Sequence, residues 1–149
     1  MLSRQDFWLF SCEFYSRPEM QARLLALQDN GSKNINLCLL LCYLDKLALT
    51  VEPEAVSTLI ETCKHFDEII LQPQRRIRSL LKAQHHHYED YLQLRAAMLT
   101  AELELEKRQQ ALLLEVLQHS HLYPLQQGSN LRHYLSDNEY TALFAPVND

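Results

Sequence analysis

The segment that decides the fold is residues 35–49, INLCLLLCYLDKLAL, in which Asp45 and Lys46 are the only charged side chains. Asn34 precedes this run and can cap a helix by accepting a hydrogen bond from a free backbone N–H group. A helix that is apolar on every side belongs at the centre of a packed domain. The run is also shorter than the roughly 20 residues of a membrane span. We therefore expect residues 35–49 to form the central helix of a bundle and no segment to cross a membrane.

The composition of the whole chain favours helices. Only 2 of the 149 residues are glycine and 5 are proline, which leaves few turn-forming residues for a protein built from many short strands. Apolar residues make up 47% of the chain and charged residues 22%, a balance that is typical of one globular domain and excludes a disordered chain. We expect an all-α fold, a single-domain bundle of five to seven helices over residues 1–149.

Two helices are expected before the apolar run. Ser3, with an aspartate three residues later, is typical of a helix N-cap, and residues 7–15 carry aromatic side chains over a broad helical face. Pro18 is typical of the first turn of a second helix. That helix should end at the pair Asn30-Gly31, where Gly31 suits the left-handed backbone conformation of a helix end.

Two further helices are expected after the apolar run. Pro53 should open a helix whose core face carries Val56, Leu59, Ile60 and Cys63. Pro73 should kink the chain or start a new helix. The residues after it keep an apolar stripe at helical spacing, opposite a group of arginines.

Residues 88–122 contain neither glycine nor proline and predict one long helix or a kinked pair in the C-terminal half. Such a helix spans roughly 50 Å, whereas a domain of this size is about 40 Å across. It should overhang the domain, bend or find a partner. Leucines on more than one of its sides suit packing against a second chain. A homodimer formed through this helix and a solvated overhang are both open alternatives.

The C-terminal residues 124–149 should hold two short helices. One is expected near residues 131–135, and the other should be capped by Ser136 with Glu139 three residues later. This segment either packs on the bundle or is attached to it loosely as a tail.

One basic group is the best candidate for a contact outside the chain. It consists of Arg75, Arg76, Arg78 and Lys82, and a helix brings Arg75, Arg78 and Lys82 to a shared face. Guanidinium groups suit carboxylates and phosphates. The group either pairs with acidic residues of the long helix or binds an acidic protein, RNA or a small anion. Nucleic acid is the least favoured of the macromolecular partners, because the chain carries a net charge of −5.

A second candidate site is a polar cluster between two apolar helices, formed by Gln28, Asp29, Asn34 and Asn36. Asn36 needs a partner there, since an unpaired buried amide costs about 1–3 kcal/mol. Asp29 or an arginine from residues 75–78 can supply it. The cluster is therefore either a structural polar network or part of a pocket around Asp29, Asn36 and Arg78, which would bind a small anionic ligand or act as an enzyme.

Cysteines and histidines give little support to a metal site. All four cysteines, Cys12, Cys38, Cys42 and Cys63, lie among apolar residues and should be buried free thiols of a reducing compartment. An apolar environment also raises the pKa of a thiol and so disfavours a metal-binding thiolate. The adjacent histidines 85–87 fan out around a helix and make a poor preformed site. We expect no metal and no cofactor.

The chain carries none of the local patterns that position catalytic groups. Gly-rich phosphate loops, the G-x-S-x-G turn and the H-E-x-x-H motif are all missing from the sequence, and we assign no catalytic residue. The N-terminal residues MLSRQDFWLF do not look like a secretory signal. We expect a non-enzymatic helical interaction or adaptor module of the cytoplasm, which binds a protein partner or itself.

Four segments carry a family resemblance: FWLFSCEFYSRP (7–18), LLALQDNGSKNINLCLL (24–40), IILQPQRRIRSLLK (69–82) and AELELEKRQQALL (101–113). They resemble an uncharacterised bacterial family of small all-helical proteins, a domain of unknown function, through the motifs F-W-x-F-S, L-Q-D and N-x-N-L. The resemblance covers roughly residues 7–117. It implies a helical fold and a bacterial cytoplasmic protein, and it implies no reaction or cofactor.

Overall fold

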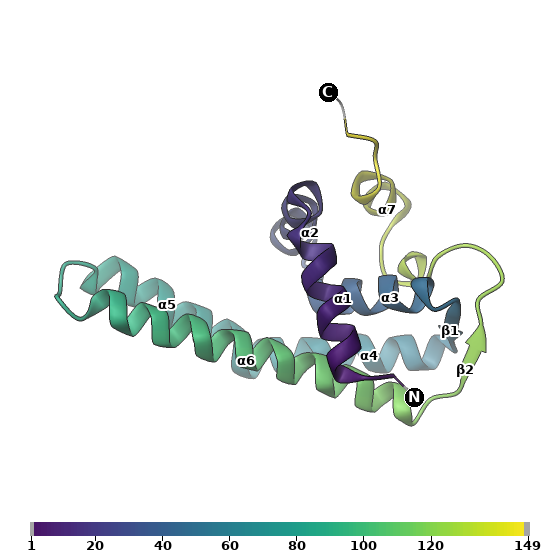
Figure 1. The fold of residues 1–149 in the computed structure, drawn as a ribbon, viewed down its shortest axis with the longest axis horizontal. Helices are drawn as coiled ribbons and strands as arrows, with labels where there is room; N and C mark the ends of the chain where they lie inside the picture. Colours follow the sequence, from purple (N-terminus) through teal and green to yellow (C-terminus); the bar gives the residue numbers. More distant parts are fainter. Residues whose placement is uncertain (1, 148–149) are drawn as a thin grey trace.

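Helix α3 (Ile35–Lys46) runs through the centre of the fold in the computed structural model, which describes residues 2–147 (Figure 1). Every residue from Leu37 to Leu44 is buried. The Asn34 side chain caps this helix by accepting a hydrogen bond of 2.8 Å from the backbone N–H of Leu37. The other helices pack round this apolar helix. The prediction of an all-α domain is confirmed, because helices make up most of the described chain.

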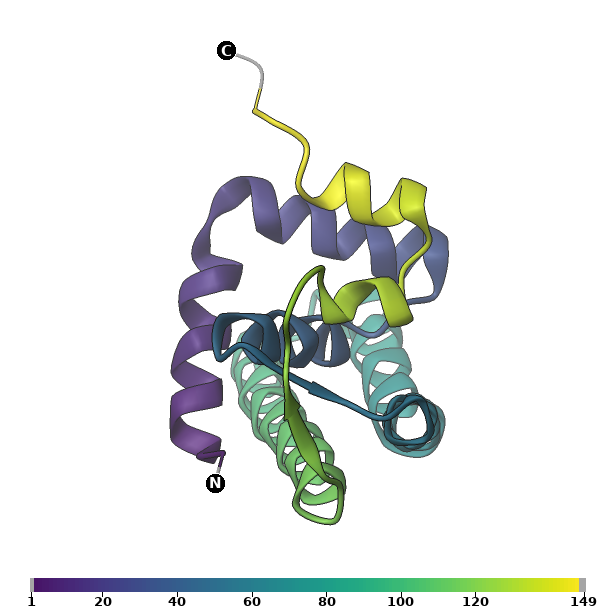
Figure 2. The ribbon, with the colours of Figure 1, turned by 90° about the vertical axis from the view of Figure 1, so that its right-hand side faces the viewer.

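Helices α1 (Arg4–Ser16) and α2 (Pro18–Gly31) wrap round two sides of α3 (Figure 2). Ser3 caps α1 and Pro18 opens α2, as predicted. The end of α2 differs from the prediction, since Gly31 is helical and Ser32 takes the left-handed conformation with φ of 54°. Glycine serves another purpose there, because a Cβ at Gly31 would lie 2.6 Å from Oε2 of Glu139.

Three helical segments follow one another without a loop: α4 (Pro53–Phe66), the π-helix η1 (Asp67–Leu71) and α5 (Gln72–His85). Pro73 lies in the first turn of α5 and has no N–H group to donate. In the wider π turn the N–H of Gln72 donates to the carbonyl of Asp67, five residues earlier. The segment therefore passes Pro73 without leaving the helical path.

Helix α6 (Tyr91–Gln118) runs back along α5 and α4 (Figure 1). It is shorter than the predicted 88–122, because a turn precedes it and strand β2 (Leu122–Pro124) follows it. This strand pairs in antiparallel register with β1 (Leu49–Val51), Val51 opposite Leu122. The two-stranded ribbon was not expected. Strands of three residues are too short to show an alternating apolar pattern in the sequence.

The residues after β2 form the 3-10 helix η2 (Asn130–His133) and helix α7 (Asp137–Leu143). Ser136 and Glu139 make the predicted capping box. Leu131, Leu135 and Leu143 are buried in the common core. Arg23 on α2 also donates a hydrogen bond of 3.0 Å to the carbonyl of Leu143.

The outer half of the α5–α6 hairpin projects from the rest of the molecule (Figure 1). We call residues 72–101 the arm, and none of them is buried. No helix within residues 2–147 is both long enough and apolar enough to cross a membrane.

Candidate functional site

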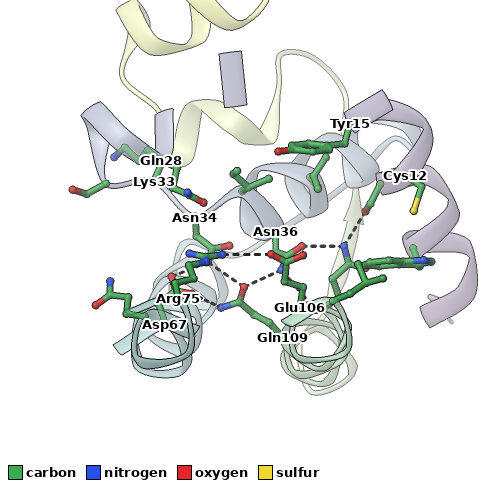
Figure 3. Close-up of a pocket in the computed structure, with 18 residues that line it drawn as sticks. Cys12, Tyr15, Gln28, Lys33, Asn34, Asn36, Asp67, Arg75, Glu106 and Gln109 are labelled. Atoms are coloured by element: carbon green, nitrogen blue, oxygen red, sulfur yellow. Dashed lines mark hydrogen bonds and ion pairs between the residues drawn. The ribbon is translucent and has the colours of Figure 1, made fainter. Parts of the chain in front are cut away.

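A cavity of about 370 Å³ opens beside the N-terminal end of α3 (Figure 3). One wall comes from α1, which contributes Trp8, Cys12 and Tyr15. The remaining walls come from the α2–α3 junction, the π-helix, the start of α5 and the middle of α6. Segments that are far apart in the sequence thus meet at one polar opening in a largely apolar body.

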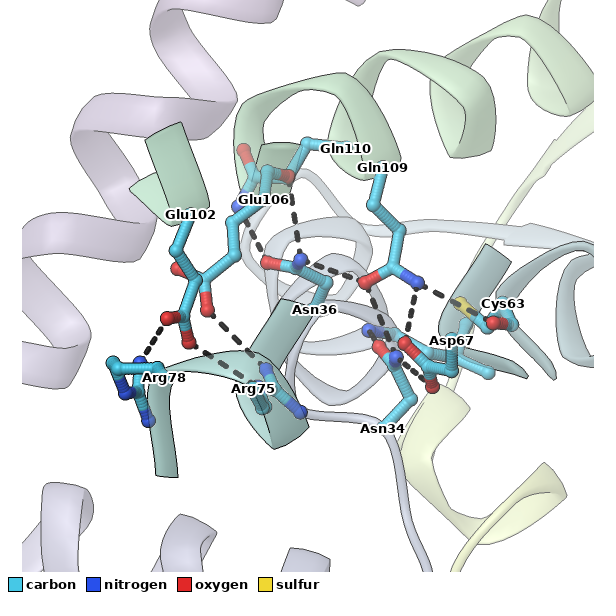
Figure 4. Close-up of polar contacts among 11 residues, drawn as sticks. Asn34, Asn36, Cys63, Asp67, Arg75, Arg78, Glu102, Glu106, Gln109 and Gln110 are labelled. Carbon is cyan, nitrogen blue, oxygen red and sulfur yellow. Dashed lines mark hydrogen bonds and ion pairs between the residues drawn. The ribbon is translucent and has the colours of Figure 1, made fainter. Parts of the chain in front are cut away.

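The floor of this cavity is a network of side-chain amides centred on Gln109 of α6 (Figure 4). Its Nε2 donates to Asp67 Oδ1 at 3.0 Å and to the Cys63 carbonyl at 3.4 Å. Its Oε1 accepts from Asn34 Nδ2 at 3.1 Å and from Asn36 Nδ2 at 2.9 Å. All four hydrogen-bonding positions of this buried amide are used, and the network joins α3, α4, η1 and α6.

Asn36 finds its partners on α6, not on Asp29 or an arginine as expected from the sequence. Besides Gln109, it donates to the Glu106 carbonyl at 3.4 Å and accepts from Gln110 Nε2 at 3.1 Å. Gln110 also donates to Ser11 Oγ of α1 at 3.0 Å. The two glutamines were missed, although a polar pair directly before the apolar run 111–114 was a visible signal.

The predicted polar cluster is only partly brought together. Gln28, Asn34 and Asn36 line the cavity, whereas Asp29 is exposed on α2 and Arg78 lies outside the cavity wall. The pocket is therefore not the one expected around Asp29, Asn36 and Arg78. The Nδ2 group of Asn34 has two acceptors, because it donates to Asp67 Oδ2 at 2.8 Å as well as to Gln109.

Two of the four residues in the basic group pair with acids of the long helix. Arg75 lies 3.3 Å from Glu102 and 3.4 Å from Glu106, and Arg78 forms an ion pair with Glu102 (Figure 4). Arg76 and Lys82 are exposed and form no ion pair within residues 2–147. Burial raises the pKa of Glu106, and the nearby Arg75 only partly offsets this effect.

Three of the cysteines are buried as expected, and burial raises the pKa of Cys38 to about 12. Cys12 is instead exposed, because the outer side of α1 faces the cavity and solvent. The histidines 85–87 lie exposed where α5 meets the following turn. Within the described part of the chain, no three His, Cys, Asp or Glu residues are grouped so that they could hold a metal ion.

The arm carries an unusual share of exposed apolar side chains. Five of the thirteen large apolar residues exposed in the described chain belong to these 30 residues. They are Ile77, Leu80, Tyr88, Leu92 and Leu94. Leu92 is 75% exposed. The predicted apolar stripe on α5 therefore faces solvent for much of its length, which marks this surface as a candidate for contact with another chain.

The sequence profile of the family described as "Protein of unknown function (DUF2390)" matches residues 6–113. The chain belongs to the DUF2390 family. The resemblance to an uncharacterised family is thus confirmed, and the matched span contains the whole arm and every residue that lines the cavity. No curated protein and no solved structure matches this DUF2390 chain.

Proposed function

We propose that this DUF2390 protein is a non-enzymatic interaction module that pairs with a second copy of itself through the arm. The observation that carries the proposal is the exposure of Ile77, Leu80, Leu92 and Leu94 on the arm, in which no residue is buried. Two antiparallel helices bury little apolar area alone, and packing against two more helices is the usual way to cover such faces.

The ion pairs that the basic group makes within the chain support self-pairing over the binding of an acidic partner. Arg75 and Arg78 are already neutralised by Glu102 and Glu106. The other charges of the arm are of mixed sign: Arg76, Lys82 and Arg95 on the helices, and Glu89 and Asp90 at the tip. In a twofold pair with overlapping, antiparallel arms, the acidic tip of one copy lies beside the basic helices of the other.

Internal pairing of the cavity's charged groups supports a non-enzymatic role. Asp67 accepts hydrogen bonds from Asn34 and Gln109, and Glu106 faces Arg75. These carboxylates make contacts between helices, which supports a structural role for them. The four free thiols suit a reducing compartment. The proposal therefore includes the bacterial cytoplasm that the family resemblance implies.

Analytical ultracentrifugation over a range of concentrations tests the proposal. The wild-type chain should form dimers at tens of micromolar. Replacing Leu80 and Leu92 together with serine should leave a monomer, because these apolar side chains would drive the pairing. Their exposure predicts that the variant melts at the same temperature as the wild-type chain when both are dilute enough to be monomeric.

The matched control replaces Leu9 and Leu25, which are exposed on α1 and α2, with serine in the same way. This variant should still dimerise. A wild-type chain that stays monomeric throughout the concentration range would overturn the self-pairing proposal. A dimer that survives the change of Leu80 and Leu92 would also overturn it, since the contact would then lie elsewhere.

A further inference from the structure

One residue of the cavity wall, Gln110, has a buried polar atom for which the described protein provides no partner. Gln110 lines the cavity and is 3% exposed, and its Oε1 accepts no hydrogen bond from any described residue. A buried acceptor without a donor costs free energy in the empty protein. A molecule that brings an N–H or O–H group to this atom would recover that cost.

The orientation of the Gln110 amide is fixed by its neighbours. The Ser11 hydroxyl donates to the Phe7 carbonyl at 2.8 Å, so its oxygen is left to accept from Gln110 Nε2. Asn36 uses its Nδ2 to donate to Gln109, so its Oδ1 also accepts from Gln110 Nε2. Turning the amide round would break both bonds, and the free group is therefore an acceptor.

Charges around the cavity are neutralised within the protein. Arg75 pairs with Glu102 and Glu106, and Asp67 is held by two amides. Lys33 donates to the Tyr134 carbonyl at 3.2 Å. The side chains of Gln28 and Gln72 also line the cavity, make no hydrogen bond within residues 2–147 and are free to contact a guest. The site thus suits a neutral molecule with hydrogen-bonding groups.

Aromatic side chains on α1 supply a flat apolar wall. Trp8 and Tyr15 both line the cavity and are partly buried. Lys107 Nζ lies 4.9 Å from the centroid of the Trp8 ring, a cation–π contact that helps to hold the indole in place. Planar rings stack well on such a surface. The cavity volume of about 370 Å³ lies in the range of small-molecule sites.

We propose that this cavity binds a neutral, planar nitrogen heterocycle of the nucleobase class. The ring stacks on Trp8, and one of its N–H groups donates to Gln110 Oε1. This assignment uses α1, α3 and α6 and does not depend on the pairing of two copies through the arm.

Fluorescence provides a direct test, because Trp8 is the only tryptophan of the chain. Titration with free purine and pyrimidine bases should give a saturable change of emission for at least one base. A fully N-methylated xanthine is the matched control compound, since it is planar and neutral but has no N–H group to donate. It should bind at least tenfold more weakly than xanthine itself.

Two variants of the cavity wall and one control variant separate an effect on binding from an effect on folding. Gln110→Leu should weaken binding at least tenfold, whereas Gln118→Leu, which changes an exposed glutamine of the same helix, should not. Leu103→Arg places a charge at the half-exposed rim and should abolish binding without lowering the melting temperature. No saturable change with any base at millimolar concentration would overturn the proposal. Equal binding of the N-methylated compound, or wild-type binding by Gln110→Leu, would overturn it as well.

Discussion

The side chain of Gln109 is the centre of the amide network at the floor of the cavity. Its amide connects Asp67, Asn34 and Asn36 and is 1% exposed. Removing it takes away one hydrogen-bonding partner from each of these three side chains and from the Cys63 carbonyl, and it breaks the link between α6 and the other helices.

Gln109→Ala should therefore lower the free energy of unfolding by about 2–4 kcal/mol. Urea denaturation followed by circular dichroism measures this loss. Gln118→Ala, on the exposed side of the same helix, is the control and should change stability by less than about 0.5 kcal/mol. Equal effects of the two substitutions would show that the network contributes nothing to stability.

Individual residues were predictable from the sequence where their contacts are local. Ser3, Asn34 and Ser136 cap helices by bonding a residue three positions away, and these assignments are correct. Asn36 was predicted to need a partner, and it has three, all on α6. Their identity was not predictable, because they lie 70 to 74 positions away and only the packing of α6 against α3 brings them to Asn36.

Among the elements, α5 and α6 are joined by the ion pairs of Arg75 and Arg78 with the buried Glu102. The sequence offered this pairing as one of two interpretations of the basic group. It was left undecided because helical spacing shows which residues share a face but not which neighbour that face meets.

Arg78→Ala should destabilise the protein by about 1–2 kcal/mol, between the values for exposed and buried ion pairs. The reason is that the buried Glu102 side chain loses one of its two ion-pair partners. Arg76→Ala, two residues earlier on the same helix, is the matched control and should leave the urea midpoint almost unchanged, since Arg76 is exposed. A similar shift for both variants would contradict the internal role of Arg78.

The starts of the helices that begin with proline were predicted more accurately than the two ends of the long helix α6. Pro18 and Pro53 open α2 and α4, since proline both suits and marks the first turn. The end of α6 at Gln118 and the strand that follows it were missed, because the pairing of β2 with β1 is a contact between distant segments. The π-helix at Asp67–Leu71 likewise gave no signal beyond the proline after it.

At the scale of the whole molecule, the length of the last long helix was the most informative feature of the sequence. It was expected to overhang a domain of this size, bend or find a partner, and the N-terminal part of α6 does project from the body (Figure 1). Its neighbour in the projection is α5 of the same chain, as in the interpretation that pairs the basic group with acids of the long helix. The result is a two-helix arm that shows apolar side chains to solvent.

Hydrogen–deuterium exchange at low and high protein concentration is the most direct test of the role proposed for this arm. In dilute protein the backbone amides of residues 76–98 should exchange quickly, since none of these residues is buried, while those of α3 exchange slowly. At high concentration the exchange of residues 76–98 should slow markedly and that of α3 should not change. Exchange of the arm at the same rate in both samples would contradict the account.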